Sequence, residues 1–238
     1  MKVAVCLFGI VGGRSGKNGQ GGYIDYELCA EHYKKHIFNN NDVDVFIHTW
    51  SHELEEELTR LYNPKDAIFE KQIEFKPKAS HRGKSRWYSN KSVLDLVRKS
   101  ENKSGKKYDA VMVTRFDTMF LKDMLFDEYD PSYFYAPNWN NPPLKRCGSD
   151  NPVKRINASL ARANSKSPGF SDLWFLSNSD YMHSFSKLYN QYDKYHPSPH
   201  RASWSHVHTF VPAKMVAYSM HRWFDFELYR WKVEGVYE

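Results

Sequence analysis

YDAVMVTRFDTMFL, residues 108–121, joins a short apolar run to a pair of charged side chains. Ala110–Val113 is rich in β-branched residues, which predicts a buried strand. Arg115 and Asp117 follow it, so both charges are expected where this strand ends. In open α/β sheets, ligands bind at the carboxyl ends of the strands, and an Asp beside an Arg at such a place suits a metal ion or a phosphate. A structural ion pair between the two side chains explains the same pattern equally well.

The chain opens with a strand, a Gly-rich segment and a helix. Lys2–Phe8 is the predicted strand and Tyr23–Phe38 the predicted helix. A Gly-rich loop brings backbone N–H groups close to an anion, so we expect it to contact a nucleotide phosphate. The residues expected to do so are Gly9, Gly12, Gly13, Arg14 and Lys17. The spacing matches neither GxxxxGK[ST] nor GxGxxG, which argues against a P-loop enzyme and leaves an ordinary surface loop as the alternative.

Strands and helices alternate through the first half of the chain. Val43–Trp50 and Ala67–Glu70 are predicted strands, and Glu53–Leu61 and Trp87–Lys99 are predicted helices. This alternation predicts a mostly parallel, doubly wound α/β sheet flanked by helices. In the second half we expect strands near residues 133–136, 172–176 and 204–208, a helix over 180–195, and a long loop over 137–166.

Composition limits the class of protein and its partners. The 238 residues fit one domain, and 41% hydrophobic with 26% charged residues is typical of a globular protein. No run approaches the roughly 18 apolar residues of a membrane span, and Cys6, Cys29 and Cys147 form no CxxC zinc motif. These features predict a cytoplasmic protein with reduced thiols. The formal charge of +6 favours anionic ligands, but the basic residues are dispersed, so no specific nucleic-acid partner is expected.

Four segments, taken in order, carry a resemblance to a known family. They are Val3–Gly9, Asp42–Trp50, Trp87–Ser89 and Tyr108–Asp117. Their order and spacing resemble small GT-A-type glycosyltransferases encoded by bacteria and by large viruses, including viruses of algae. The resemblance covers most of the chain. It implies a Rossmann-like GT-A fold in a single domain over residues 1–238, in the host cytoplasm if the protein is viral.

The resemblance implies a transfer reaction and gives each half of the chain a substrate. Residues 1–120 would bind a nucleotide-sugar donor, with a UDP-sugar favoured, and residues 121–238 would bind a glycan or glycoprotein acceptor. In that family a carboxylate motif, usually Asp-x-Asp, follows the central strand and binds Mn²⁺ or Mg²⁺ on the donor diphosphate. Here the first acidic position is Arg115 and the second is Asp117. Asp117 is therefore the expected metal ligand, and Arg115 could neutralise phosphate directly.

Further site residues are predicted for both substrates. Asp172 lies at a turn before an apolar stretch and is the candidate base for the acceptor hydroxyl if the configuration inverts; capping of the turn is its alternative role. His206 and His208 are expected on one face of a strand, where they could complete a metal shell, although a lone His is more often structural. Trp87 is expected to stack on base or sugar, with core packing as its alternative.

Two other classes of function stay open at this stage. A sulfotransferase-like enzyme would use Gly13–Gly16 as its phosphate loop and would need neither a metal nor Asp117. A non-catalytic carbohydrate- or nucleic-acid-binding domain would turn over no sugar nucleotide, and its binding to polyanions would depend steeply on salt. The Asp at the end of the central strand favours the glycosyltransferase over both.

Overall fold

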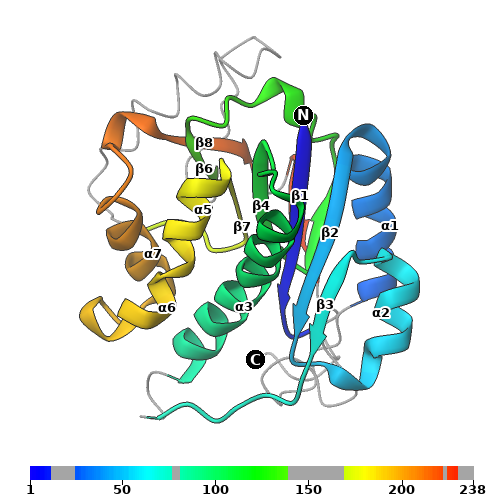
Figure 1. Cartoon of the computed structure of the whole chain (residues 1–238), viewed down its shortest axis with the longest axis horizontal. Coiled ribbons are helices and arrows are strands. Elements are labelled where there is room, and N and C mark those ends of the chain that lie inside the picture. The colour runs from blue at the N-terminus through cyan, green and yellow to red at the C-terminus, as the bar shows by residue number, and fades with distance from the viewer. Residues whose placement is uncertain (12–24, 77–80, 139–168, 222–223, 230–238) are drawn as a thin grey trace.

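A seven-stranded sheet forms the centre of the structure, a computed structural model that describes residues 1–11, 25–76, 81–138, 169–221 and 224–229 (Figure 1). The strands are β1 (Lys2–Gly9), β2 (Asp42–Thr49), β3 (Asp66–Phe69), β4 (Ala110–Arg115), β6 (Phe134–Asn138), β7 (Trp174–Ser177) and β8 (Val216–His221). They are arranged in the order β3-β2-β1-β4-β7-β6-β8. The long apolar strands in the middle are typical of a sheet that is covered on both faces.

The sheet is mostly parallel, as predicted, and one strand reverses. β1 pairs in parallel with β2 and β4, β2 with β3, and β6 with β8. β7 lies between β4 and β6 and is antiparallel to both. A small second sheet pairs β5 (Thr118–Phe120) with β9 (Phe226–Leu228) in antiparallel fashion. The α/β class and the single domain expected from the sequence are therefore confirmed.

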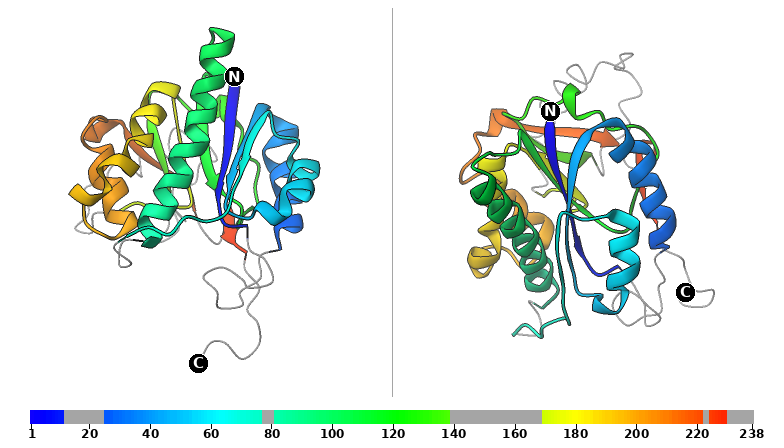
Figure 2. Two further views of the ribbon diagram at one scale, coloured as in Figure 1. Left: turned by 60° about the horizontal axis from the view of Figure 1, so that its bottom comes forward. Right: turned by 45° about the vertical axis from the view of Figure 1, so that its right-hand side comes forward.

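Helices cover both faces of the sheet (Figure 2). On one face lie α1 (Tyr26–His36) and α2 (Glu55–Tyr62), and on the other lie α3 (His81–Ser104), α5 (Ser179–Ser186), α6 (Leu188–Gln191) and α7 (Pro199–Val207). Successive side chains of a strand point to opposite faces, so β1 supplies two cores. Val3, Val5 and Leu7 pack on the α1 side, and Ala4, Cys6 and Phe8 pack on the α3 side.

The crossover helices change from one face of the sheet to the other between β1 and β4. The connection from β1 to β2 runs through α1, and the connection from β3 to β4 runs through α3 on the opposite face. Open α/β sheets bind ligands outside the carboxyl ends of the strands at such a switch point. Gly9 ends β1 and Arg115 ends β4, with Phe8 opposite Arg115 in the register. These two ends define the carboxyl edge discussed below.

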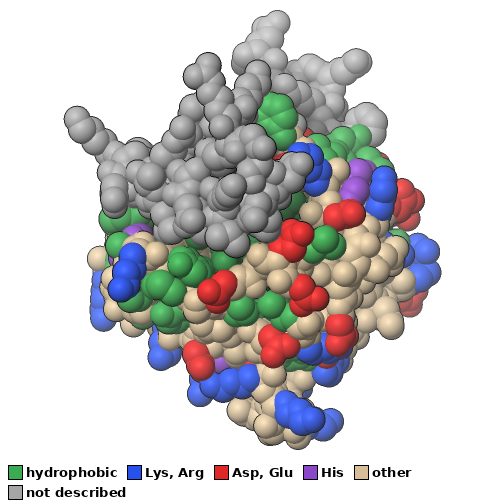
Figure 3. Space-filling view, turned by 90° about the horizontal axis from the view of Figure 1, so that it is seen from above, with side chains coloured by type: hydrophobic (Ala, Val, Ile, Leu, Met, Phe, Trp, Pro, Cys, Tyr) green, Lys and Arg blue, Asp and Glu red, His purple; other side chains and the backbone are tan. Residues whose placement is uncertain are grey.

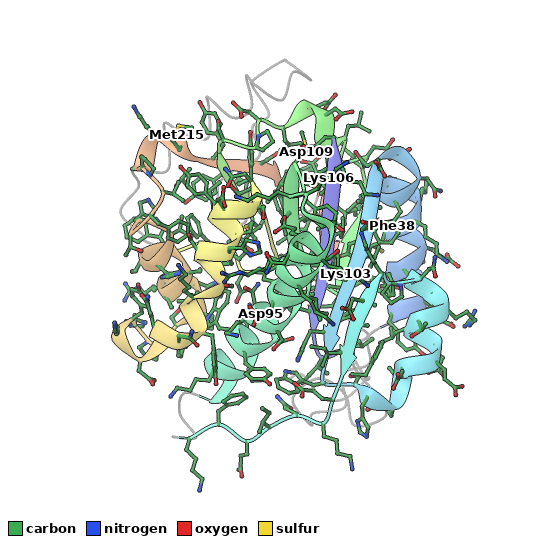
Figure 4. The ribbon with its side chains drawn as sticks, viewed as in Figure 1. Phe38, Asp95, Lys103, Lys106, Asp109 and Met215 are labelled. Atoms are coloured by element: carbon green, nitrogen blue, oxygen red, sulfur yellow. The ribbon has the colours of Figure 1, made fainter. Side chains whose placement is uncertain are left out.

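The opposite edge of the sheet, where β1 begins, carries exposed ion pairs. The backbone N–H of Lys2 donates to Asp109 over 2.6 Å, and the Lys2 ammonium lies 2.9 Å from Asp44, which also pairs with Lys65. Figure 4 shows Asp109 and Lys106 at this end of the molecule. Seen from above, the coloured basic and acidic side chains are interspersed (Figure 3), consistent with the dispersed charge noted in the sequence.

Residues 204–208 were expected as a strand, and this prediction is wrong. They belong mostly to helix α7, which has Pro199 in its first turn, a favoured place for proline. The buried residues of α7 are Ala202, Ser203, His206 and Val207. Their spacing follows the helical period, whereas the alternation in Trp-Ser-His-Val-His resembles a strand only over that short window.

Two other elements differ from the prediction in their bounds. The helix expected over Trp87–Lys99 is longer at both ends, since α3 begins at His81 and ends at Ser104. The helix expected over residues 180–195 is divided into α5, α6 and a 3-10 turn at Tyr192–Lys194.

Cys6 and Cys29 are free and buried. Among the helices of the described ranges, none combines the length and the hydropathy that a membrane span requires.

Candidate functional site

The carboxyl end of β1 is held by a hydrogen-bond network that includes β2 and α3. Gly9 has a φ of +106°, a conformation that L side chains rarely adopt. Its N–H donates to Ser89 Oγ of α3 over 2.8 Å. Ser89 Oγ lies 2.7 Å from His48 Nδ1, and His48 Nε2 lies 2.9 Å from a carboxylate oxygen of Glu70. The point where the Gly-rich segment leaves the sheet is therefore fixed by side chains of two neighbouring elements.

The partners of His48 determine which of its ring nitrogens carries the hydrogen. The Glu70 carboxylate only accepts hydrogen bonds, so His48 Nε2 must donate to it. Burial lowers the pKa of His48, against the opposing effect of Glu70, which favours the neutral ring. His48 Nδ1 then accepts from the hydroxyl of Ser89.

An aromatic cluster of Trp50, Phe75 and Tyr88 borders this network. The rings of Trp50 and Tyr88 stack with their centroids 5.2 Å apart, and Phe75 lies 5.7 Å from Tyr88. The backbone N–H of Trp50 donates to Gly9 O over 3.3 Å, which places the cluster beside the end of β1. Tyr88 and Phe75 are only half-buried, so this cluster reaches the surface at the carboxyl edge.

Trp87, the predicted stacking residue, lies inside the core. Its side chain is 1% exposed and packs edge-on against Phe185, with the ring centroids 5.6 Å apart. This is the core-packing alternative that the sequence left open. The rotation of α3 about its axis turns Trp87 inward and leaves the next residue, Tyr88, at the carboxyl edge. The sequence Trp-Tyr alone does not predict which of the two aromatic side chains faces the core.

Arg115 and Asp117 form a two-pronged ion pair at the end of β4. Arg115 Nε donates to Asp117 Oδ1 over 2.8 Å, and Arg115 Nη2 donates to Asp117 Oδ2 over 2.5 Å. Asp117 is 0% exposed and Arg115 is 6% exposed. Two parallel bonds between a guanidinium and a carboxylate are among the stronger polar contacts in proteins. The structure thus contains the ion pair that was one of the two alternatives for this motif.

Asp172 lies just before β7, the strand next to β4, and its carboxylate is close to the Arg115–Asp117 pair. Because β7 is antiparallel to β4, the residues just before β7 lie at the edge where β4 ends. Asp172 Oδ1 lies 3.7 Å from Arg115 Nη1, and its other oxygen forms an ion pair with Arg86 of α3. Arg86 also donates to the backbone oxygen of Asp172 over 3.2 Å. Asp172 is buried with both carboxylate oxygens beside guanidinium groups, and its role as the base remains a prediction.

Within the described residues, the site offers no ligand set for the expected divalent metal. Both oxygens of Asp117 accept hydrogen bonds from Arg115. No group of three His, Cys, Asp or Glu side chains is arranged to hold an ion in the part of the chain that the structure describes. Mn²⁺ and Mg²⁺ require several oxygen ligands or waters. We therefore derive no step through a metal, and the requirement for one remains a prediction.

His206 and His208 were expected on the same face of a strand, and this is wrong. They lie at the end of helix α7, where residues two apart point in different directions. His206 Nε2 donates to Ser184 O over 3.0 Å, and its Nδ1 lies 3.1 Å from Tyr195 Oη. His206 is 2% exposed, and with both ring nitrogens hydrogen-bonded it packs as a structural residue. His208 Nδ1 donates to Trp204 O over 2.8 Å.

Most of the predicted phosphate loop lies outside the described residues. Gly12, Gly13, Arg14 and Lys17 lie outside the described residues, and Gly9 alone of that set is described. The contact of these residues with a phosphate remains a prediction.

His200 is a residue of this edge that the sequence prediction missed. It lies in the first turn of α7, and its Nδ1 is 3.9 Å from Asp172 Oδ2. The signal that could have found it is Pro199 after Ser198, which is typical of a helix start. Only the packing of α7 against the segment before β7 brings His200 to the cluster.

Comparison with known proteins adds no relative. No protein-family model matches the chain, and no curated protein sequence matches it significantly. Function is therefore inferred from the fold and from the carboxyl edge of the sheet.

Proposed function

We propose that the chain is a glycosyltransferase that moves a sugar from a nucleoside diphosphate sugar, with a UDP-sugar favoured, to a hydroxyl group of a glycan or glycoprotein. The observation that carries the proposal is the position of the ion-pair cluster of Arg86, Arg115, Asp117 and Asp172. The cluster lies at the carboxyl edge, next to the switch point between β1 and β4, where open α/β sheets bind nucleotides. The GT-A form of the fold and a cytoplasmic location belong to the same proposal.

A nucleoside diphosphate suits the groups at this edge. Glycosyl transfer expels the diphosphate, so negative charge grows on the leaving phosphate, and nearby guanidinium groups lower the barrier. Arg115 and Arg86 supply such groups, and Gly9 begins the Gly-rich segment whose backbone N–H groups suit an anion. The aromatic cluster that includes the half-buried Tyr88 lies beside the end of β1, and aromatic rings near a nucleotide site suit a base.

The acceptor would approach from the side of β7 and α7, in the second half of the chain. That side brings Asp172 and His200 to the edge, 3.9 Å apart. Transfer to a hydroxyl with inversion requires a base for its proton, and this side supplies carboxylate and imidazole groups beside the expected donor site.

Binding of nucleotide sugars tests the proposal directly. UDP-, GDP- and TDP-sugars are screened by thermal shift, each with and without Mn²⁺, and release of nucleoside diphosphate is then measured. A ligand that binds only the folded protein raises the Tm by mass action. Replacing Arg14 and Lys17 together by Ala should weaken donor binding, whereas the same change at Lys34 and Lys35, in the last turn of α1, is the matched control.

The rival functions give different outcomes in the same experiments. A sulfotransferase-like enzyme would be stabilised by 3′-phosphoadenosine 5′-phosphosulfate and not by nucleotide sugars. A binding domain would bind a glycan or a polyanion without releasing any nucleoside diphosphate, and polyanion binding would weaken steeply with salt. Either outcome would remove the proposal.

A further inference from the structure

Within the described part of the chain, His200 has one ring nitrogen in a hydrogen bond and the other without one. Its Nδ1 lies 2.7 Å from the backbone oxygen of Phe170. A carbonyl oxygen only accepts, so Nδ1 carries the hydrogen. The His200 side chain is 53% exposed, and no hydrogen bond from the described residues reaches its Nε2. The exposed nitrogen of this ring is therefore the one with the lone pair when the ring is neutral.

The surroundings of His200 favour that neutral ring. Partial burial lowers the pKa of His200, and the guanidinium groups of Arg86 on α3 and Arg115 on β4 lower it further, while the hydrogen bond to Phe170 opposes them. Among the residues that the structure describes, the carboxylate of Asp172, before β7, also lies near the ring, 3.9 Å from Nδ1. A neutral imidazole with an accessible lone pair near neutral pH meets the requirement for a general base.

Backbone contacts hold His200 in place against the segment before β7. The N–H of Phe170 donates to His200 O over 3.1 Å, so these two residues are hydrogen-bonded in both directions. Ser203 Oγ also donates to His200 O, over 3.0 Å. A Cβ built at Gly169 would lie 3.4 Å from His200 Cβ, an ordinary van der Waals contact, so the segment before β7 packs directly against His200. A base whose ring is oriented by a third group is the arrangement found in activated catalytic sites.

We propose that His200, and not Asp172, is the catalytic base of the transfer, an inference that rests on the proposed function. Nε2 of His200 takes the proton of the acceptor hydroxyl, and the hydroxyl oxygen bonds to the anomeric carbon of the donor sugar. The bond between that carbon and the diphosphate oxygen breaks, and the nucleoside diphosphate leaves with the electron pair. The anomeric configuration is inverted in this single displacement.

Asp172 has a positioning role in this scheme. Its carboxylate is beside Arg86 and Arg115 and lies 3.9 Å from His200 Nδ1. A negative charge at that distance stabilises the imidazolium that forms when Nε2 is protonated. Because the Asp172 oxygens already have ion-pair partners, the open Nε2 is the better-placed proton acceptor.

The sharpest variant is His200→Asn. The amide nitrogen of Asn takes the place of Nδ1–H and can still donate to Phe170 O, but Asn offers no base where Nε2 was. The matched control is His196→Asn, at an exposed histidine whose Nδ1 accepts from the N–H of Ser198. Both variants are assayed for nucleotide release from UDP-glucose, GDP-mannose and TDP-glucose, with water as acceptor, and for the Tm shift that each donor causes.

We expect His200→Asn to lower kcat about 10²–10⁴-fold, the usual contribution of a general base. The KM for the donor and the donor-induced Tm shift should stay as in the wild type, and the acid limb of the kcat–pH profile should disappear. His196→Asn should change none of these. The sugar released to water should first appear with inverted anomeric configuration, read by NMR before it equilibrates, and initial retention would overturn the inference.

The result that overturns the role of His200 differs from the one that overturns the proposed function. If the wild type binds and turns over a donor while His200→Asn keeps near-normal kcat and the acid limb, the base is another group. If Asp172→Asn loses the acid limb of the kcat–pH profile while His200→Asn stays active, Asp172 is the base. If no donor shifts the Tm or is turned over, the proposed function fails and the role of His200 fails with it.

A second variant covers the case in which His200→Asn does not fold. His200→Ala is assayed with added imidazole, which can enter the space left by the ring. Recovery of turnover that follows the imidazole concentration supports a missing base. A folded His200→Ala protein with kcat near that of the wild type, or one whose lost turnover imidazole does not restore, would contradict it.

Discussion

The guanidinium of Arg115 donates to both carboxylate oxygens of Asp117, over 2.8 and 2.5 Å, at the end of the central strand. Both residues are buried. Asp172 brings a second carboxylate to 3.7 Å from the same guanidinium, and Arg86 pairs with Asp172 in turn. The formal charges of the two Arg and two Asp residues cancel. A donor phosphate that binds here must therefore compete with carboxylates for these guanidinium groups.

Asp117→Asn is expected to destabilise the protein by about 3–5 kcal/mol, because breaking a buried pair leaves the charge of Arg115 uncompensated. Urea unfolding measures the change. The matched control is Asp95→Asn on α3, at an exposed carboxylate paired with Lys91 one turn earlier, for which about 0.3–0.5 kcal/mol is expected.

The metal-ligand prediction for Asp117 gives a different result in the same variant. If Asp117 holds Mn²⁺, Asp117→Asn should remove the dependence of nucleotide release on Mn²⁺ and change the urea midpoint little. A midpoint equal to that of the wild type would contradict the structural ion pair.

Ser89→Ala is expected to cost about 1–3 kcal/mol, since it leaves the N–H of Gly9 and a ring nitrogen of His48 without their buried partner. Ser104→Ala is the control, at the exposed end of the same helix; its hydroxyl makes only 3.2 Å hydrogen bonds to backbone groups there, so it should cost less than Ser89→Ala. Equal unfolding midpoints for the two variants would show that the network around Gly9 adds no stability.

Stability is expected to fall as the pH drops below about 6.5, the ordinary pKa of histidine. Burial lowers the pKa of His48, His200 and His206 in the folded protein. The unfolded chain therefore binds more protons between the folded and unfolded pKa values, so stability rises with pH through that interval and is complete above it. Tm values from pH 7.5 to pH 5 measure the slope.

The contribution of a single histidine to that slope can be isolated. His206→Gln should flatten the dependence of Tm on pH, since it removes one buried group that titrates differently in the two states. His52→Gln changes an exposed histidine and is the control. An unchanged slope in His206→Gln would show that the ring of His206 is not the source of any of the pH dependence.

Gly83→Ala is expected to destabilise the protein by about 1–3 kcal/mol through overpacking. A Cβ at Gly83 would lie 1.9 Å from Tyr192 Oη, whose hydroxyl donates to Pro197 O over 2.5 Å. The tyrosine must move and lose that bond, even though Ala has the higher helix propensity. Adding Tyr192→Leu should make the cost of Gly83→Ala smaller in a double-mutant cycle, and strict additivity would contradict the clash.

The strands β1 and β4 were predictable because each is a nearly continuous buried run, as in sheets covered on both faces, and β2 contains a shorter one. Lys2–Phe8 was predicted and β1 is Lys2–Gly9; Val43–Trp50 was predicted and β2 is Asp42–Thr49. Residues 204–208 were mistaken for a strand because five residues of alternating polarity are too few to distinguish the two periods. Pro199 was the better signal there.

The sequence alone determined the mostly parallel α/β class and the place of Arg115 and Asp117 at the end of the central strand, since both follow from apolar patterns within a few neighbouring residues. Only the tertiary structure decided that these two side chains bind each other and that Arg86, Asp172 and His200 lie beside them. Those residues come from α3, from the segment before the antiparallel β7 and from α7. Their meeting depends on how distant segments pack, because strand direction and helix rotation are set by burial across the whole sheet and not by local propensity.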